Sequence, residues 1–178
     1  MELFDLYDEN RIKTGKTMER GNPEPKGFYR MVVHICIFND SGKMLIQRRL
    51  DNKHSWSGMW DFTVGGSAVT GDTSLTAAIR ETSEEIGIEL APHELRRALT
   101  VQTENVFDDI YIVNRTVDMS EITLQAEEVA EVKWADMDEI LKKIDEGVFI
   151  PYHRALVELL FFMRDHIGAR TREDTTSA

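Results

Sequence analysis

GSAVTGDTSLTAAIRETSEEIGI, residues 66–88, carries the clearest local pattern in this chain of 178 residues. Apolar side chains recur over residues 73–86 at the three- and four-residue spacing of one helix face. The polar run 72–74 can cap the start of such a helix, and Gly87 can end it. We therefore predict a helix over residues 73–86.

Three glutamates on this helix, Glu81, Glu84 and Glu85, are spaced so that they share one face. Their like charges repel each other and destabilise an isolated helix. Arg80 can pair with Glu84 one turn away, but one guanidinium cannot neutralise three carboxylates. A hard divalent cation such as magnesium can, because it prefers oxygen ligands. On these residues alone, a solvated acidic face without a metal stays open as the alternative.

Gly66, just before the helix, lets the backbone pass close to a ligand and leaves a carbonyl unhindered. From here the chain resembles the Nudix box: Gly, five residues, Glu, seven residues, Arg-Glu, an apolar residue, any residue, Glu-Glu, any residue, Gly, an apolar residue. Every spacing matches, while Asp72 replaces the first glutamate and Thr82 replaces the apolar residue. We expect Thr82 to pack its methyl and to bond its hydroxyl back to the helix.

The flanking strand order is also similar to that of a Nudix domain, so the resemblance covers roughly residues 28–165. It implies an α+β fold with a mixed β-sheet sandwiched between α-helices. It also implies magnesium or manganese as the cofactor, held by Glu81, Glu84, Glu85 and the Gly66 carbonyl. The implied reaction is hydrolysis of a diphosphate, such as a nucleoside diphosphate, linked to another moiety.

The general base in such a reaction is a carboxylate near the attacking water. The candidates are Glu81 and Glu84 on the helix, and Glu128 in a later acidic pair whose position resembles that of a family loop acid. For Glu128, ordinary surface charge in a loop is an equally good interpretation.

The region before the box resembles the branch of the family that contains isopentenyl-diphosphate isomerases. There the bases matching Arg49 and Lys53 grip the substrate diphosphate; a solvated basic loop is the alternative. The isomerase also needs a catalytic cysteine, and its position is occupied by Gly65 here. The single cysteine, Cys36, lies in an apolar run and is expected in the core. A hydrolase is therefore favoured over an isomerase, and over a non-catalytic domain that senses a nucleotide or sugar diphosphate.

Composition limits the remaining possibilities. The chain carries 21 Lys and Arg against 32 Asp and Glu, a net charge of −11, which disfavours a nucleic-acid polymer as partner. The longest dense apolar run, residues 159–163, is too short to span a bilayer, so no membrane association is expected. The acidic N-terminus differs from the basic start of a signal peptide, so a cytoplasmic protein is expected.

The chain is expected to form one domain. We assign an N-terminal arm or short strand to residues 1–27, a Nudix domain to residues 28–167 and a polar tail to residues 168–178; the arm offers a route to a homodimer. Other expected elements are strands over residues 30–38, 43–49, 61–64, 95–102, 110–117 and 129–134, and helices over residues 137–145 and 151–167.

Overall fold

The computed structural model describes residues 2–51 and 55–170. Its centre is a mixed sheet in which β3 and β8 are parallel and every other neighbouring pair is antiparallel. The main path is β5-β4-β3-β8-β7, with β6 added on β3 and β9 added on β4. The strands are β3 (Arg30–Phe38), β4 (Met44–Arg49), β5 (Trp60–Asp61), β6 (Val64–Ser67), β7 (Arg96–Gln102), β8 (Val106–Asn114) and β9 (Val129–Ala135).

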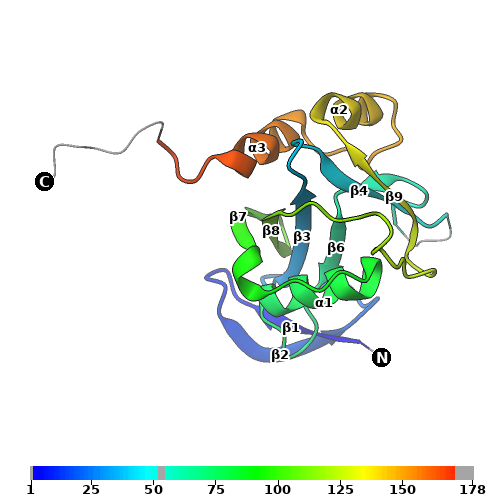
Figure 1. Ribbon diagram of the computed structural model, residues 1–178. Helices are drawn as coiled ribbons and strands as arrows, with labels where there is room; N and C mark the ends of the chain where they lie inside the picture. Colours follow the sequence, from blue (N-terminus) through cyan, green and yellow to red (C-terminus); the bar gives the residue numbers. More distant parts are fainter. Residues whose placement is uncertain (1, 52–54, 171–178) are drawn as a thin grey trace, which may run out of the picture.

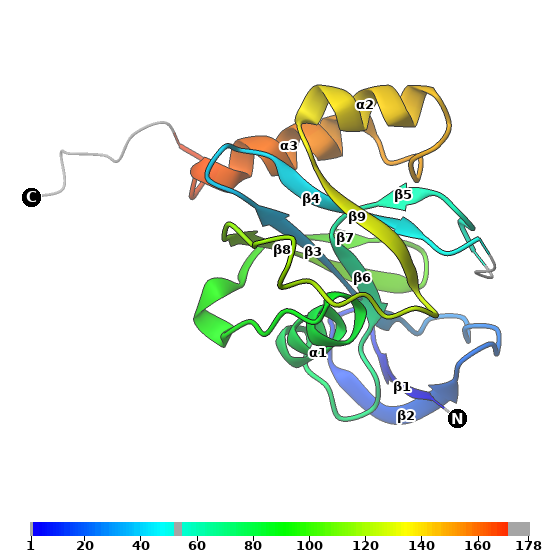
Figure 2. The same ribbon diagram turned by 45° about the vertical axis from the view of Figure 1, so that its right-hand side comes forward.

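Helices cover both faces of this sheet (Figures 1 and 2). Helix α1 (Ser74–Ile86) lies on one face, and α2 (Met137–Asp145) and α3 (Arg154–Asp165) lie on the other. The alternation along β3 explains this, because Ile35 belongs to the core under α1 whereas Cys36 belongs to the core under α2 and α3. The expected α+β fold, a mixed sheet between helices, is confirmed. Within the described residues, no helix has both the length and the apolar character that a membrane span requires.

The expected strand over residues 61–64 is in fact two strands with different neighbours. Strand β5 ends at Asp61 and pairs with β4, whereas β6 begins at Val64 and pairs with β3. The two residues between them are held by side chains: Asp61 accepts from the Phe62 N–H at 2.8 Å, and the Thr63 hydroxyl accepts from the Ile37 N–H at 2.9 Å. These contacts end one pairing and start the next, and local sequence does not reveal them.

Two other expected elements differ at their ends. Strand β8 starts at Val106 rather than at residue 110, because all nine of its residues pair in parallel with β3. Helix α3 starts at Arg154 rather than at residue 151, because the backbone of His153, at φ −59° and ψ 132°, is not helical. A short 3-10 helix, Pro92–Glu94, was not predicted.

The N-terminal segment is a β-hairpin rather than an arm or a single strand. Strands β1 (Leu3–Tyr7) and β2 (Lys13–Glu19) pair antiparallel. Between them, the Arg11 guanidinium donates to both oxygens of Asp109, at 3.0 and 2.7 Å. Asp109 is fully buried on β8, so this ion pair ties the hairpin to the central sheet. The expected homodimer stays a prediction.

Replacing Arg11 by alanine should destabilise the protein, because the buried Asp109 carboxylate loses two charge-assisted hydrogen bonds. We expect the free energy of unfolding to fall by about 1–3 kcal/mol. Chemical denaturation measures this change, with Lys16→Ala on the exposed part of β2 as the control. Equal stability of the two variants would show that the ion pair does not anchor the hairpin.

Candidate functional site

Local contacts fix helix α1 as the sequence predicted. Thr73 caps the helix and accepts from the Thr76 N–H at 3.1 Å, and Gly87 ends it in the left-handed conformation at φ 71°. Thr82 is fully buried and donates its hydroxyl to the Ala78 carbonyl at 2.7 Å, which confirms its expected role. The helix therefore presents its glutamates from a rigid, well-capped support.

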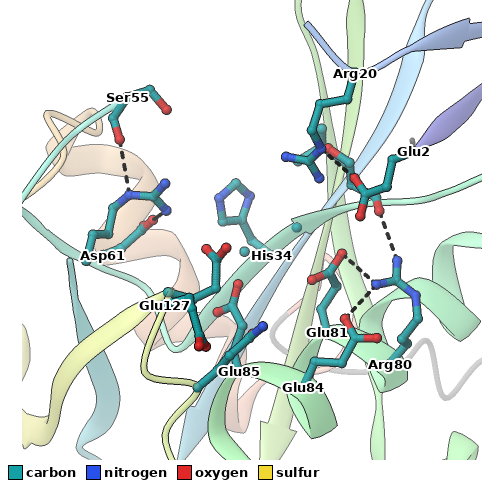
Figure 3. A pocket seen from close by; sticks show the side chains of 17 residues that line it. Glu2, Arg20, His34, Ser55, Asp61, Arg80, Glu81, Glu84, Glu85 and Glu127 are labelled. Atoms are coloured by element: carbon teal, nitrogen blue, oxygen red, sulfur yellow. Dashed lines mark hydrogen bonds and ion pairs between the residues drawn. The ribbon is translucent and has the colours of Figure 1, made fainter. Parts of the chain in front are cut away.

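The glutamates of α1 face a cavity of about 610 Å³. Figure 3 shows Glu81, Glu84 and Arg80 on one side of it, Asp61 and Ser55 on the other, and His34 between them. The polar and charged residues of the lining are Glu2, Arg20, His34, Arg49, Ser55, Asp61, Ser67, Arg80, Glu81, Glu84, Glu85, Gln125, Glu127 and Glu128.

Arg80 holds the acidic wall together. Its guanidinium lies 3.1 Å from Glu81 and 2.9 Å from Glu84, which confirms the expected one-turn pair, and it also donates to Asp72 at 3.0 Å. The replacement of glutamate by the shorter Asp72 therefore keeps the contact with the motif arginine. Asp72 also accepts from the Thr76 hydroxyl at 3.1 Å, so the loop before α1 is fixed to the helix.

The Glu81 carboxylate packs against the backbone of Gly66. A Cβ atom at Gly66 would lie 2.1 Å from Cδ of Glu81, far inside any allowed contact. Backbone and carboxylate oxygens are thereby brought to the same part of the cavity.

Glu85 is the most deeply buried acid of the three, with 6% of its surface exposed. Burial raises the pKa of its carboxyl to about 8, opposed by a hydrogen bond from Gln47 Nε2 and reinforced by the charge of Glu81. That bond is 2.9 Å long. The Oε1 atom of Gln47 is buried and has no hydrogen-bond partner in the described part of the chain. Burial also raises the pKa of Glu81, although the charge of Arg80 opposes the rise.

These residues fit a hard divalent cation that is shared with a substrate. Within residues 2–51 and 55–170, no three His, Cys, Asp or Glu side chains are grouped closely enough to hold an ion by themselves. Magnesium does not need such a cage, because it keeps several waters and commonly uses one or two carboxylates together with substrate phosphates. The donors here are carboxylate oxygens. Burial disfavours the negative charge of Glu81 and Glu85, and Arg80 offsets this effect at Glu81.

The structure also places the other residues that the sequence selected. Arg49 lines the cavity, donating from Nε to the Ser55 carbonyl at 3.4 Å, and its Nη1 lies 3.6 Å from Asp61. Glu128 lines the cavity as well, and its carbonyl accepts from the Leu50 N–H at 3.1 Å. Lys53 lies outside the described residues.

Sequence reasoning missed several residues of the wall. His34 is not among the residues that the sequence selected, since a strand residue can face either side of the sheet, and Asp61 falls in an expected strand without a role. Arg20 and Glu2 come from the N-terminal hairpin and form an ion pair with each other. Their only sequence signal is charge, which is common on surfaces.

A comparison with protein families agrees with this geometry. The profile of the NUDIX domain matches residues 28–154. This chain belongs to the Nudix family. The match contains α1 and most of the cavity lining, while the hairpin lies before it.

Several curated Nudix proteins are similar over most of the chain. An uncharacterised Nudix hydrolase of Listeria monocytogenes is 41% identical over 152 residues, covering 85% of this chain and 90% of that protein. Nudix hydrolase 3 of Arabidopsis thaliana is 34% identical and covers 85% of this chain but 22% of the plant protein. An isopentenyl-diphosphate Delta-isomerase of Escherichia coli is 29% identical over 61% of this chain and 63% of the isomerase.

Solved structures show the same fold. A crystal structure from Deinococcus radiodurans has a TM-score of 0.73 at 23% identity and covers 89% of this chain and 97% of that one. The MutT protein of Methanosarcina mazei has a TM-score of 0.62 at 21% identity, covering 82% and 100%. Helix α1, which carries the glutamates of the Nudix motif, therefore lies in a Nudix fold.

The raised pKa of Glu85 predicts how the stability of this Nudix domain depends on pH. The folded state holds this proton more tightly than the unfolded chain, so stability without metal should fall as pH rises from 4.5 to about 8. Magnesium should restore most stability at the upper end of this range, where the carboxyl is ionised.

Thermal unfolding at stepped pH, with and without magnesium, measures both effects. Glu85→Gln removes the titrating group, so its Tm should vary less with pH and respond less to magnesium. Parallel profiles for the two proteins would contradict the assignment.

Proposed function

We propose that this protein is a magnesium- or manganese-dependent hydrolase of a small molecule in which a diphosphate, such as a nucleoside diphosphate, is linked to another moiety. The observation that carries this proposal is that Glu81, Glu84 and Glu85 line a cavity that Arg49 also lines, in contact with Ser55 and Asp61. A cavity of about 610 Å³ suits a small molecule rather than a polymer. We further propose that residues 28–167 carry this activity.

Glu81, Glu84, Glu85 and the Gly66 carbonyl would hold the ion. When bound, it supplies positive charge to the phosphate oxygens and a bound water of lowered pKa. The protein's part is to keep these carboxylates in place. Arg80 orients Glu81 and Glu84, and Gln47 orients Glu85.

A carboxylate at the cavity also takes the proton from the attacking water. Glu81, Glu84 and Glu128 all line the cavity and remain the candidates. Half of the Glu84 side chain is exposed, whereas 12% of Glu81 is, so the two differ in their access to bulk water.

Arg49 and Lys53 are proposed to bind the diphosphate. A guanidinium offers a planar pair of donors that matches phosphate oxygens, and an ammonium adds a mobile point charge. Only 18% of the Arg49 side chain is exposed, so it lies in the cavity wall rather than in bulk solvent.

The similarity to isopentenyl-diphosphate isomerases supports one alternative, isomerisation of a diphosphate. Two observations weigh against it. By resemblance, the catalytic cysteine of the isomerase falls at Gly65, which has no side chain. A Cβ atom at this position would lie 3.0 Å from the His34 ring. Cys36 is fully buried, and burial raises the pKa of its thiol well above the usual range. A hydrolase therefore remains the proposal.

Glu85→Gln and Glu84→Gln should each lower the magnesium-dependent release of phosphate from a diphosphate-containing metabolite. We expect a loss of roughly 10²–10³-fold, because charge stabilisation at the phosphate supplies much of the rate. A panel of such metabolites assayed for phosphate identifies the substrate. Glu158→Gln, an exposed position on α3, is the matched control. Near-full activity in Glu84→Gln and Glu85→Gln would refute the metal assignment.

Incubation of isopentenyl diphosphate in deuterated buffer tests the isomerase alternative. We expect no deuterium in the recovered compound, and Cys36→Ala should keep the hydrolytic activity of the unmodified protein. Deuterium incorporation that disappears in Cys36→Ala would overturn the hydrolase proposal.

A further inference from the structure

A chain of hydrogen-bonded polar side chains, partly buried, runs beside the cavity that the α1 glutamates line. Nδ1 of His34 lies 2.8 and 3.0 Å from the two oxygens of Asp108. Nε2 of His34 lies 3.2 Å from the Tyr152 hydroxyl, which donates to Oδ1 of Asp61 at 2.8 Å. Oδ2 of Asp61 lies 3.6 Å from Nη1 of Arg49. The chain therefore leads from β8 to the cavity arginine on β4.

The direction of each hydrogen bond follows from which atoms carry protons. Tyr152 has one hydroxyl proton, which it donates in a hydrogen bond to the Asp61 carboxylate. The Tyr152 oxygen therefore accepts a hydrogen bond from Nε2–H of His34. Nδ1 faces Asp108, which also accepts. His34 thus donates from both ring nitrogens and carries a positive charge. Burial disfavours that charge, but the carboxylates of Asp108, Asp61 and Glu85 together raise the pKa of the ring to about 9.

Packing holds this chain in one arrangement. The Tyr152 ring stacks on Phe62 with centroids 4.3 Å apart. His34 packs against Gly65, where a Cβ would lie 3.0 Å from the imidazole. Asp61 is 2% exposed, so its charge depends on its polar neighbours rather than on water.

Asp61 is the link between this chain and the proposed phosphate binder. One of its oxygens is occupied by Tyr152 and by the Phe62 N–H at 2.8 Å, and the other faces Arg49. The Asp61 carboxylate, fixed by these contacts, therefore lies beside the Arg49 guanidinium at the cavity wall. Without the Tyr152 hydroxyl, Asp61 loses one of the contacts that set its orientation.

We propose that His34, Tyr152 and Asp61 are positioning residues for diphosphate binding, which act by holding Arg49 against the cavity. This inference rests on the proposed function for the role of Arg49. Of the three, His34 and Asp61 lie before the glutamate motif, and Tyr152 follows it by more than sixty residues, so none belongs to it.

A double-mutant cycle between Tyr152→Phe and Arg49→Ala tests the proposal. The ligand is methylenediphosphonate, a diphosphate that resists hydrolysis, titrated calorimetrically with magnesium present. Tyr152→Phe removes one hydroxyl and keeps the ring on Phe62. We expect it to weaken binding by about tenfold in the parent protein and by less than about twofold in the Arg49→Ala background. His34→Gln, which removes the ring charge, should behave in the same way.

Val157→Ala is the matched control, because it removes buried methyl groups from the core against which Tyr152 packs. It changes none of the hydrogen-bonded side chains from Asp108 to Arg49. Its affinity for methylenediphosphonate should equal that of the parent, even where its Tm falls. Tyr152→Phe with unchanged affinity, or with an equal loss in both backgrounds, would overturn the proposal.

Turnover measurements separate this inference from the proposed function. In the hydrolysis assay, Tyr152→Phe should raise KM more than it lowers kcat, because the hydrogen-bonded side chains affect substrate binding through Arg49. If the coupled losses of binding are observed but no diphosphate is hydrolysed, the positioning role stands and the proposed reaction is refuted. If a diphosphate is hydrolysed but the double-mutant cycle shows no coupling between Tyr152 and Arg49, only the positioning role is refuted.

Discussion

The buried carboxyl of Glu85 is the constraint around which this site is organised. An ionised carboxylate that is 6% exposed is costly unless positive charge or hydrogen bonds compensate it. Within residues 2–51 and 55–170, Glu85 accepts a hydrogen bond from Gln47. Glu81 lies close by and adds further negative charge. Arg80 compensates the outer glutamates but not this inner one. The site therefore favours a proton or a cation at Glu85, so the proposed metal binding would also affect the stability of the fold.

The two walls of the cavity have different chemical characters. The α1 wall is acidic and is set by a capped helix, by Gly66 and by Arg80. The opposite side is set by partly buried polar contacts that join β3, β4, β5, β8 and the segment before α3. An acidic wall with carboxylates suited to a cation and a wall that presents an arginine together fit the proposed diphosphate, which carries negative charge and offers its own oxygens as metal ligands.

Local rules made one half of this site predictable. Helical spacing grouped the three glutamates, and the cap at Thr73 and the stop at Gly87 fixed the helix that bears them. Family resemblance supplied Arg49. The hairpin anchor and the split of residues 60–67 into two strands were not predictable, because they depend on contacts between distant segments. The same holds for His34 and Tyr152, which are 118 residues apart and meet only in the folded chain.

The protonation state of Glu85 is the most direct test of this account, and carbon-13 NMR of labelled glutamate side chains measures it. Without a divalent cation, one carboxyl resonance, absent from Glu85→Gln, should titrate at about 8. With saturating magnesium, that resonance should show an ionised carboxylate throughout the neutral range. If every glutamate carboxyl titrates in the ordinary acidic range and magnesium leaves the Glu85 resonance unchanged, the account is contradicted.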